Sequence, residues 1–173
     1  MKKNILILTA FLFASSLLFI SCKKDKEGTT TLNVRLTDEP TAFDEVNVDI
    51  KEVMVKFAKD TTSNGWVTLV TKPGIYNLLA YQNGVDTLLA TGTFPVQVVK
   101  EIRFILGPNN TIKDGGVVYP LVIPSGSESG LKIKFSKDLR ATLETVIIDF
   151  DAALSVKKEG TGDYKLRPVL KIK

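Results

Sequence analysis

The chain has 173 residues, with 23 Lys or Arg, 19 Asp or Glu, no His and a single Cys. Without histidine there is no Ser-His-Asp triad, no Cys-His pair and no zinc site built on imidazole, and one cysteine cannot form an internal disulfide. Charges of both signs are mixed along the chain, so we expect no nucleic-acid partner despite the formal net charge of +4.

The first 22 residues have the pattern of an export signal. Lys2 and Lys3 precede an apolar stretch, residues 5–20, and Ser21 stands directly before the only cysteine, Cys22. The pattern resembles a bacterial lipoprotein signal peptide that is cleaved before Cys22. The alternatives are simple secretion and an uncleaved anchor, but this 16-residue stretch is shorter than the roughly 20 residues that span a bilayer.

This interpretation divides the chain into three parts and places it outside the cytoplasm. Residues 1–21 are the signal peptide, residues 22–30 a solvated flexible tether, and residues 31–173 a single domain. An acyl chain such as palmitate on Cys22 would hold the protein at a membrane. We therefore expect a lipid-anchored protein of the cell envelope, in the outer membrane on its periplasmic or surface side.

Beyond the tether, apolar and polar residues alternate with a period of two, which predicts β-strands. After Ile50 the apolar phase switches, which predicts a β-bulge or a strand that passes between two sheets. Short strands separated by turn residues, with no long helix, predict an all-β sandwich. The apolar stripes include Leu32-Val34-Leu36, Val46-Val48-Ile50, Val53-Val55-Phe57, Leu131-Ile133-Phe135 and Val146-Ile148-Phe150.

Two local expectations concern less regular segments. Asp86 to Ala90 is predicted to form one helical turn. Tyr164 to Ile172 is predicted to be the last strand; because Pro168 cannot donate to a ladder, this strand should lie at a sheet edge.

Six short motifs occur in an order that resembles one protein family. Together they are similar to domain-of-unknown-function (DUF) family 4382 over about Thr31 to Lys173. The resemblance implies a secreted or lipid-anchored protein with an immunoglobulin-like or transthyretin-like β-sandwich, and it carries over no catalytic residue. The motifs are Leu32-Asn-Val-Arg-Leu-Thr-Asp-Glu-Pro40, Trp66-Val-Thr-Leu69, Tyr76-Asn-Leu-Leu79, Ile123-Pro-Ser-Gly126 with Gly130-Leu-Lys-Ile133, Asp149-Phe-Asp-Ala152 with Ser155, and Tyr164-Lys-Leu-Arg-Pro168.

A pair of carboxylates is the main candidate site. Asp149 and Asp151 are two residues apart on a predicted strand, so both side chains should leave the same face. Such a pair can bind calcium or divide acid and base roles, with Asp38, Asp44 or Asp49 as further ligands if the fold brings them close. The simpler interpretation, which we favour, is an outward-facing polar pair at a strand end.

Other candidate residues depend on short patterns. Thr61 and Thr87 each follow an aspartate in an Asp-Thr-x signal of the kind used for O-glycosylation in some bacterial periplasms. Trp66 and the tyrosines, including Tyr164, could stack on sugar rings, but in a sandwich we expect them to pack in the core or at corners.

These observations predict where the protein acts and leave its ligand open. We expect a non-catalytic module for binding, adhesion or assembly, attached to a membrane by its lipid, with a glycan or another envelope protein as partner. No cofactor is expected. The alternatives are a carboxylate-dependent glycan hydrolase, for which Asp149 and Asp151 would be the first residues to test, and a calcium-binding adhesin.

Overall fold

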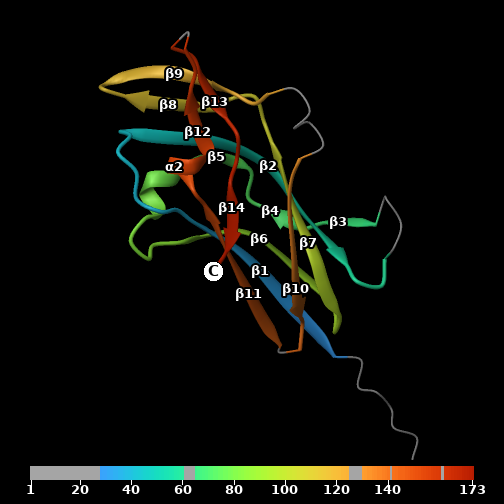
Figure 1. Ribbon diagram of the computed structural model, residues 1–173. Coiled ribbons are helices and arrows are strands. Elements are labelled where there is room, and N and C mark those ends of the chain that lie inside the picture. Colours follow the sequence, from blue (N-terminus) through green and yellow to red (C-terminus); the bar gives the residue numbers. More distant parts are fainter. Residues whose placement is uncertain (1–27, 61–64, 125–129, 141, 161) are drawn as a thin grey trace, which may run out of the picture.

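Alternating apolar residues place most of the chain in β-strands in the computed structural model, which describes residues 28–60, 65–124, 130–140, 142–160 and 162–173 (Figure 1). The strands are β1 (Thr29–Thr37), β2 (Glu45–Phe57), β3 (Trp66–Thr68), β4 (Val70–Thr71), β5 (Gly74–Asn77), β6 (Thr87–Pro95), β7 (Val98–Leu106), β8 (Thr111–Asp114), β9 (Val117–Val122), β10 (Leu131–Asp138), β11 (Leu143–Phe150), β12 (Val156–Lys158), β13 (Tyr164–Leu166) and β14 (Leu170–Ile172). The helical elements among the described residues are η2 (Leu78–Tyr81), which is 3₁₀, and α2 (Ala152–Ser155).

The strands form two mixed sheets. One has the order β14-β11-β1-β6-β4; the other has nine strands in the order β10-β7-β2-β8-β9-β13-β12, with β3 and β5 also paired to β2. The β1–β11 and β9–β13 pairs are parallel, and the other pairs are antiparallel. The all-β class predicted from the sequence is confirmed.

Strand β2 organises the larger sheet through the predicted change of phase. Its pairing with β7 shifts register between Ile50 and Glu52, which is a bulge within one strand. The inward side chains before the bulge, ending at Ile50, and those after it, beginning at Val53, are all buried. The extra residue thus keeps both halves of β2 facing the core while β2 pairs with β3, β5, β7 and β8.

The chain crosses between the sheets at Leu69. Strand β3 pairs with β2 in one sheet and β4 pairs with β6 in the other. Leu69 lies between them, 3% exposed, and its N–H donates to the Val53 carbonyl at 2.9 Å. The segment Trp66–Val70 is therefore divided between two sheets.

The predicted helical turn at Asp86–Ala90 is wrong. From Thr87 onward this segment belongs to β6, which pairs antiparallel with β1 along its length. Pairing with a distant strand satisfies the backbone N–H and C=O groups that an isolated turn would leave to water.

The last predicted strand is two strands in different sheets. Strand β13 lies between β9 and β12, whereas β14 forms an edge of the five-stranded sheet, and Pro168 lies between them. Ser155, at the end of α2, holds this crossing: its carbonyl accepts from Arg167 N at 2.8 Å and its Oγ accepts from Val169 N at 2.8 Å. The predicted position at a sheet edge is therefore confirmed for β14 and wrong for β13.

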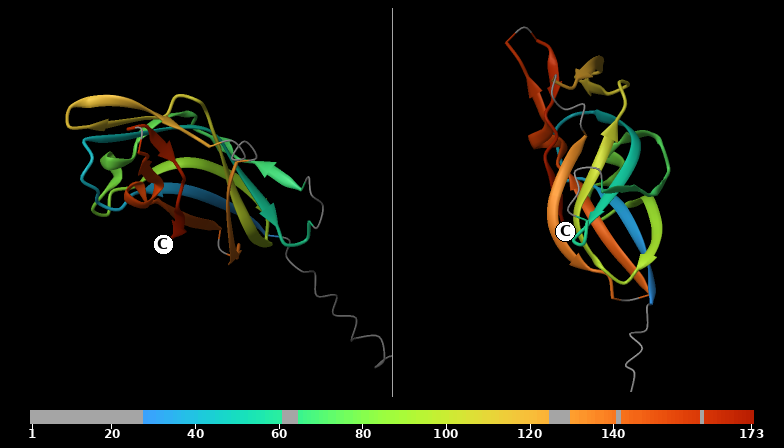
Figure 2. Two further views of the ribbon diagram at one scale, coloured as in Figure 1. Left: turned by 45° about the horizontal axis from the view of Figure 1, so that its top comes forward. Right: turned by 90° about the vertical axis from the view of Figure 1, so that its right-hand side faces the viewer.

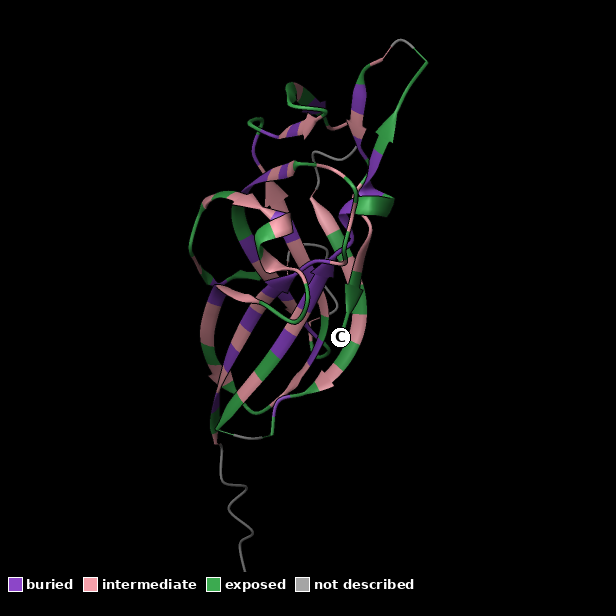
Figure 3. Cartoon of the chain, turned by 90° about the vertical axis from the view of Figure 1, so that its left-hand side faces the viewer, coloured by how far each residue is buried: buried purple, intermediate pink, exposed green. Residues whose placement is uncertain are grey.

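The core receives side chains from both sheets. Buried and exposed residues alternate along the strands, and the buried positions carry Leu, Val, Ile and Phe (Figure 3). The hairpins β8–β9 and β12–β13 project together at one end of the molecule (Figure 2). Strand β10 differs, because its inward residues Leu131, Ile133 and Phe135 are only half-buried.

Within the described ranges, no helix is long and apolar enough to cross a membrane.

Shortening an apolar side chain should lower the free energy of unfolding by an amount that depends on how deeply the side chain is buried. Ile148, fully buried on β11, should lose about 2–5 kcal/mol of unfolding free energy as Ile148→Ala. Ile75 on β5 is 59% exposed, and Ile75→Ala should change stability by about 0.5 kcal/mol or less. Urea denaturation followed by tryptophan fluorescence checks both; equal losses would contradict the core assignment.

Candidate functional site

The predicted carboxylate pair is buried at the end of β11. Asp149 is the next-to-last residue of that strand and Asp151 directly precedes helix α2; they are 1% and 4% exposed. The expectation of an outward-facing pair is therefore wrong. The chain turns inward here into a short helix that the strand-like alternation of the sequence did not predict.

Asp151 is fixed by two internal donors. Its Oδ1 accepts from Leu154 N at 2.9 Å, which caps helix α2, and its Oδ2 lies 2.7 Å from Lys171 Nζ on β14. Burial alone would raise the pKa of Asp151, but the Lys171 and Leu154 hydrogen bonds and the Lys171 charge bring this pKa below its ordinary value. Asp151 is therefore a charged structural group.

Asp38, just after β1, joins the pair from the neighbouring strand. Its Oδ1 accepts from Ala152 N at 2.9 Å and its Oδ2 accepts from Gln82 Nε2 at 3.0 Å. Burial raises the pKa of Asp38, and these hydrogen bonds oppose the rise only in part. Asp38 and Asp151 together accept hydrogen bonds from two N–H groups of α2, those of Ala152 and Leu154.

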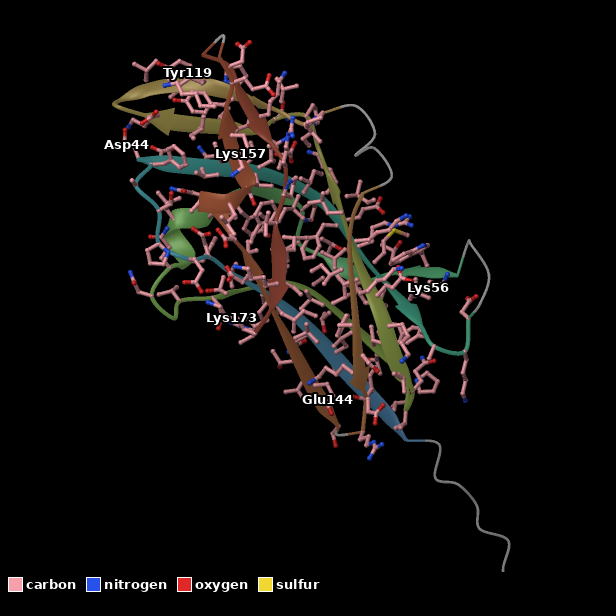
Figure 4. All side chains as sticks on the ribbon, in the orientation of Figure 1. Asp44, Lys56, Tyr119, Glu144, Lys157 and Lys173 are labelled. Atoms are coloured by element: carbon pink, nitrogen blue, oxygen red, sulfur yellow. The ribbon has the colours of Figure 1, made fainter. Side chains whose placement is uncertain are left out.

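Asp149 is the least satisfied of the three. Its buried Oδ1 has no hydrogen-bond partner among the described residues, and its Oδ2 lies 3.8 Å from Lys173 Nζ. The same ammonium lies 2.7 Å from Glu39 Oε1 (Figure 4 labels Lys173). Burial raises the pKa of Asp149 against the lowering effect of Lys173.

Asp149 and Asp151 attach β14 to the end of β11 through Lys171 and Lys173, and we call these four residues the clamp. The clamp resembles a structural contact more than a site for a ligand. Lys171 and Lys173 are both on or directly after β14, and they neutralise carboxylates that a cation would otherwise need. No group of three or more acidic side chains among the described residues is placed to hold a metal ion. Sequence reasoning missed both lysines, although their alternation with Leu170 and Ile172 was visible.

The other aspartates considered as calcium ligands lie elsewhere. Asp44 Oδ2 accepts from Gly116 N at 2.8 Å in the β8–β9 turn. Asp49 Oδ2 accepts from Asn109 N at 3.3 Å, and Lys51 Nζ lies 2.9 Å from Asp49 Oδ1. Of the candidate ligands, only Asp38 joins Asp149 and Asp151.

Of the three residues predicted to be modified, the structure describes only Thr87. Cys22 and Thr61 lie outside the described residues. Thr87 is the first residue of β6 and is half-buried, opposite Leu36 of β1. The preceding Asp86 forms an ion pair with Arg35.

The aromatic residues divide between core and surface. Tyr164 is 1% exposed and its hydroxyl donates to Asp114, as expected for a packing residue. Trp66 instead lies half-buried on β3, with the Arg103 guanidinium carbon 3.9 Å from the ring centroid. Of the two expectations for Trp66, packing in the core or at a corner, the structure excludes the core.

A groove opens at the edge of the larger sheet. It has a volume of about 550 Å³ and lies between residues 130–134, at the start of β10, and residues 168–170, which lead into β14. Its side chains include Leu131, Ile133 and Leu170, and no carboxylate lines it among the described residues. Two smaller hollows, of about 290 and 230 Å³, lie elsewhere. The groove was not predicted, because it depends on which strands become edges.

Comparison with protein families identifies the domain. The model of the family described as Domain of unknown function (DUF4382) matches residues 29–168. The chain belongs to this family. No curated protein and no solved structure matches it. The range matched to DUF4382 begins with β1 and includes Asp38, Asp149 and Asp151, whereas β14, Lys171 and Lys173 lie beyond it.

In this DUF4382 chain the clamp should contribute measurably to stability. Lys171→Met leaves the buried Asp151 Oδ2 without its donor and should cost about 1–3 kcal/mol of unfolding free energy. Arg167→Met removes an exposed ion pair to Glu159, 3.6 Å long, and should cost at most about 1 kcal/mol. Urea denaturation at pH 7 compares them; similar losses would show that Asp151 does not need Lys171.

The pKa values of Asp149 and Glu39 shift in opposite directions, so the stabilities of variants at these two residues should change with pH in opposite directions. The raised pKa of Asp149 means that its stabilising effect is present below the ordinary value of 3.8 and is lost as pH rises through the folded-state value. Asp149→Asn should therefore gain stability relative to the parent between pH 3 and pH 7.

Glu39 is the matched control. The hydrogen bond and charge of Lys173 lower the pKa of Glu39, so its contribution is present above 4.5 and is lost as pH falls through the folded-state value. Glu39→Gln should lose stability relative to the parent over the same range. Denaturant midpoints at several pH values measure both slopes, and slopes of the same sign would contradict the assignment.

Proposed function

We propose that the chain is a lipid-anchored lipoprotein of the cell envelope, in the outer membrane, whose DUF4382 domain is a non-catalytic binding module for adhesion or assembly. The observation that carries the proposal is the groove beside β10, with its half-buried Leu131 and Ile133. Apolar side chains left half-covered at a concave surface are typical of a site that a ligand completes. The ligand is a glycan or another envelope polypeptide.

The finer description of the fold belongs to the same proposal. Two sheets whose inner faces share one core are consistent with an immunoglobulin-like or transthyretin-like sandwich. In such folds the edges and end loops are the usual binding surfaces, because the inner faces are filled. A groove at an edge fits this pattern.

The carboxylates support the binding module over its alternatives. A glycoside hydrolase needs two carboxyl groups on either side of an accessible substrate. Asp149 and Asp151 are instead buried, and Asp151 is bound to Leu154 N and Lys171. Calcium prefers six or more oxygen ligands, and here it would have to displace two ammonium groups.

The lipid anchor is tested directly at Cys22. Cells supplied with labelled palmitate should incorporate the label into the parent protein, because an acylated cysteine is the expected anchor. Cys22→Ser should lose the label and leave the membrane fraction. A serine variant that stays labelled and membrane-bound would contradict lipidation at this residue.

The groove is tested by crosslinking in living cells, which requires no knowledge of the ligand. A photo-reactive residue in place of Ile133 should yield a discrete adduct with an envelope component after irradiation. The same residue in place of Ile75, which is exposed on β5, serves as the control and should yield none. If position 133 gives no adduct, or gives the same adducts as position 75, the proposed function is wrong.

A further inference from the structure

Strand β10 presents one unpaired backbone edge. Among the described residues it pairs with β7 alone, and it stands at the end of the nine-stranded sheet. Residues 131–134 border the groove, which corresponds to about 13 Å of extended chain. Unpaired N–H and C=O groups along an edge are a template for a further strand.

The two faces of β10 differ in chemistry. The inward residues Leu131, Ile133 and Phe135 are half-buried, although Ile102 and Phe104 on the neighbouring β7 are fully buried. An added strand would cover this apolar row with every second side chain, since successive side chains point to opposite faces. The geometry thus favours an extended segment with alternate apolar residues.

The outward face of β10 is positively charged. Lys132 and Lys134 are exposed, and neither forms an ion pair with a described residue. Arg103 lies opposite Lys132 on β7 and adds a third cation, while Glu101 lies opposite Lys134. Like charges directly opposite each other are unfavourable and opposite charges are favourable across paired strands.

This charge selects the kind of strand that can pair. A second copy of β10 would place lysine against lysine, so the outward residues oppose edge-to-edge pairing of two copies. An acidic segment would instead bring carboxylates beside Lys132 and Lys134. A segment in which acidic and apolar residues alternate would therefore meet both requirements, the cover for the apolar row and the negative charge beside the lysines.

Resting on the proposed binding role of the groove, we propose that its occupant is an extended acidic segment of a partner polypeptide, which adds a strand to the free edge of β10. Its apolar residues cover Leu131 and Ile133, and its carboxylates pair with Lys132 and Lys134. Main-chain hydrogen bonds supply affinity, and the alternating side chains supply selectivity.

Two synthetic peptides test this proposal on the full-length protein in non-ionic detergent. Both have nine residues, with Val alternating with Glu in one and with Lys in the other. The Glu peptide should bind about tenfold more tightly by fluorescence anisotropy, through two favourable cross-strand pairs. Its binding should also slow amide hydrogen exchange along β10.

Charge reversal provides the decisive comparison. The double variant Lys132→Glu/Lys134→Glu should prefer the Lys peptide, which also shows that the variant is folded. Lys157→Glu is the matched control, because Lys157 is exposed on β12 at the opposite edge of the same sheet, and it should leave the preference unchanged (Figure 4). Ile133→Asp should weaken binding of both peptides.

Each contrary result has a separate meaning. Absence of peptide binding, a preference that survives charge reversal, or unchanged exchange along β10 would overturn the strand proposal. If crosslinking from position 133 still gives an adduct in cells, the binding function stands and only the nature of the ligand is wrong. An adduct that consists of glycan would overturn the strand proposal in the same way.

Discussion

The structure depends on how the chain passes from one sheet to the other at residues 167–169. Pro168 cannot donate a backbone hydrogen bond, and the N–H groups on either side of it donate to the carbonyl and hydroxyl of Ser155. Ser155 ends helix α2, and Asp151 caps the start of that helix while binding Lys171. A four-residue helix therefore connects β11, β13 and β14.

This connection explains why three carboxylates are buried without forming an obvious reactive site. Asp38 and Asp151 are used as hydrogen-bond acceptors for the first turn of α2, and the lysines of β14 neutralise the charge. Burial and ion pairing act in opposite directions on the pKa values, which is why Asp149 and Asp151 shift in opposite senses. The cluster is built to hold the C-terminal strand.

The same crossing determines where the molecule is open. It places β14 at the edge of one sheet, while β10 forms the edge of the other, and the groove lies between β10 and the segment leading into β14. Neither edge has a second partner strand among the described residues. The half-buried apolar residues of β10 follow from that position, and Lys132 and Lys134 form no ion pair with a described residue. This edge is the surface on which we propose that a partner binds.

The sequence by itself determined the all-β class, the change of apolar phase in β2, the inward stripes such as Leu32 to Leu36, and the family, because period-2 alternation and local motifs are properties of neighbouring residues. That the phase change is a bulge within one strand was decided by the pairing of β2 with β7. It gave no access to the division of Trp66–Val70, the strand at Thr87 or the burial of Asp149 and Asp151. Those features depend on which distant strand supplies the hydrogen bonds. Tertiary structure alone decided them, because pairing energy is gained between segments far apart in the chain and overrides weak local preference.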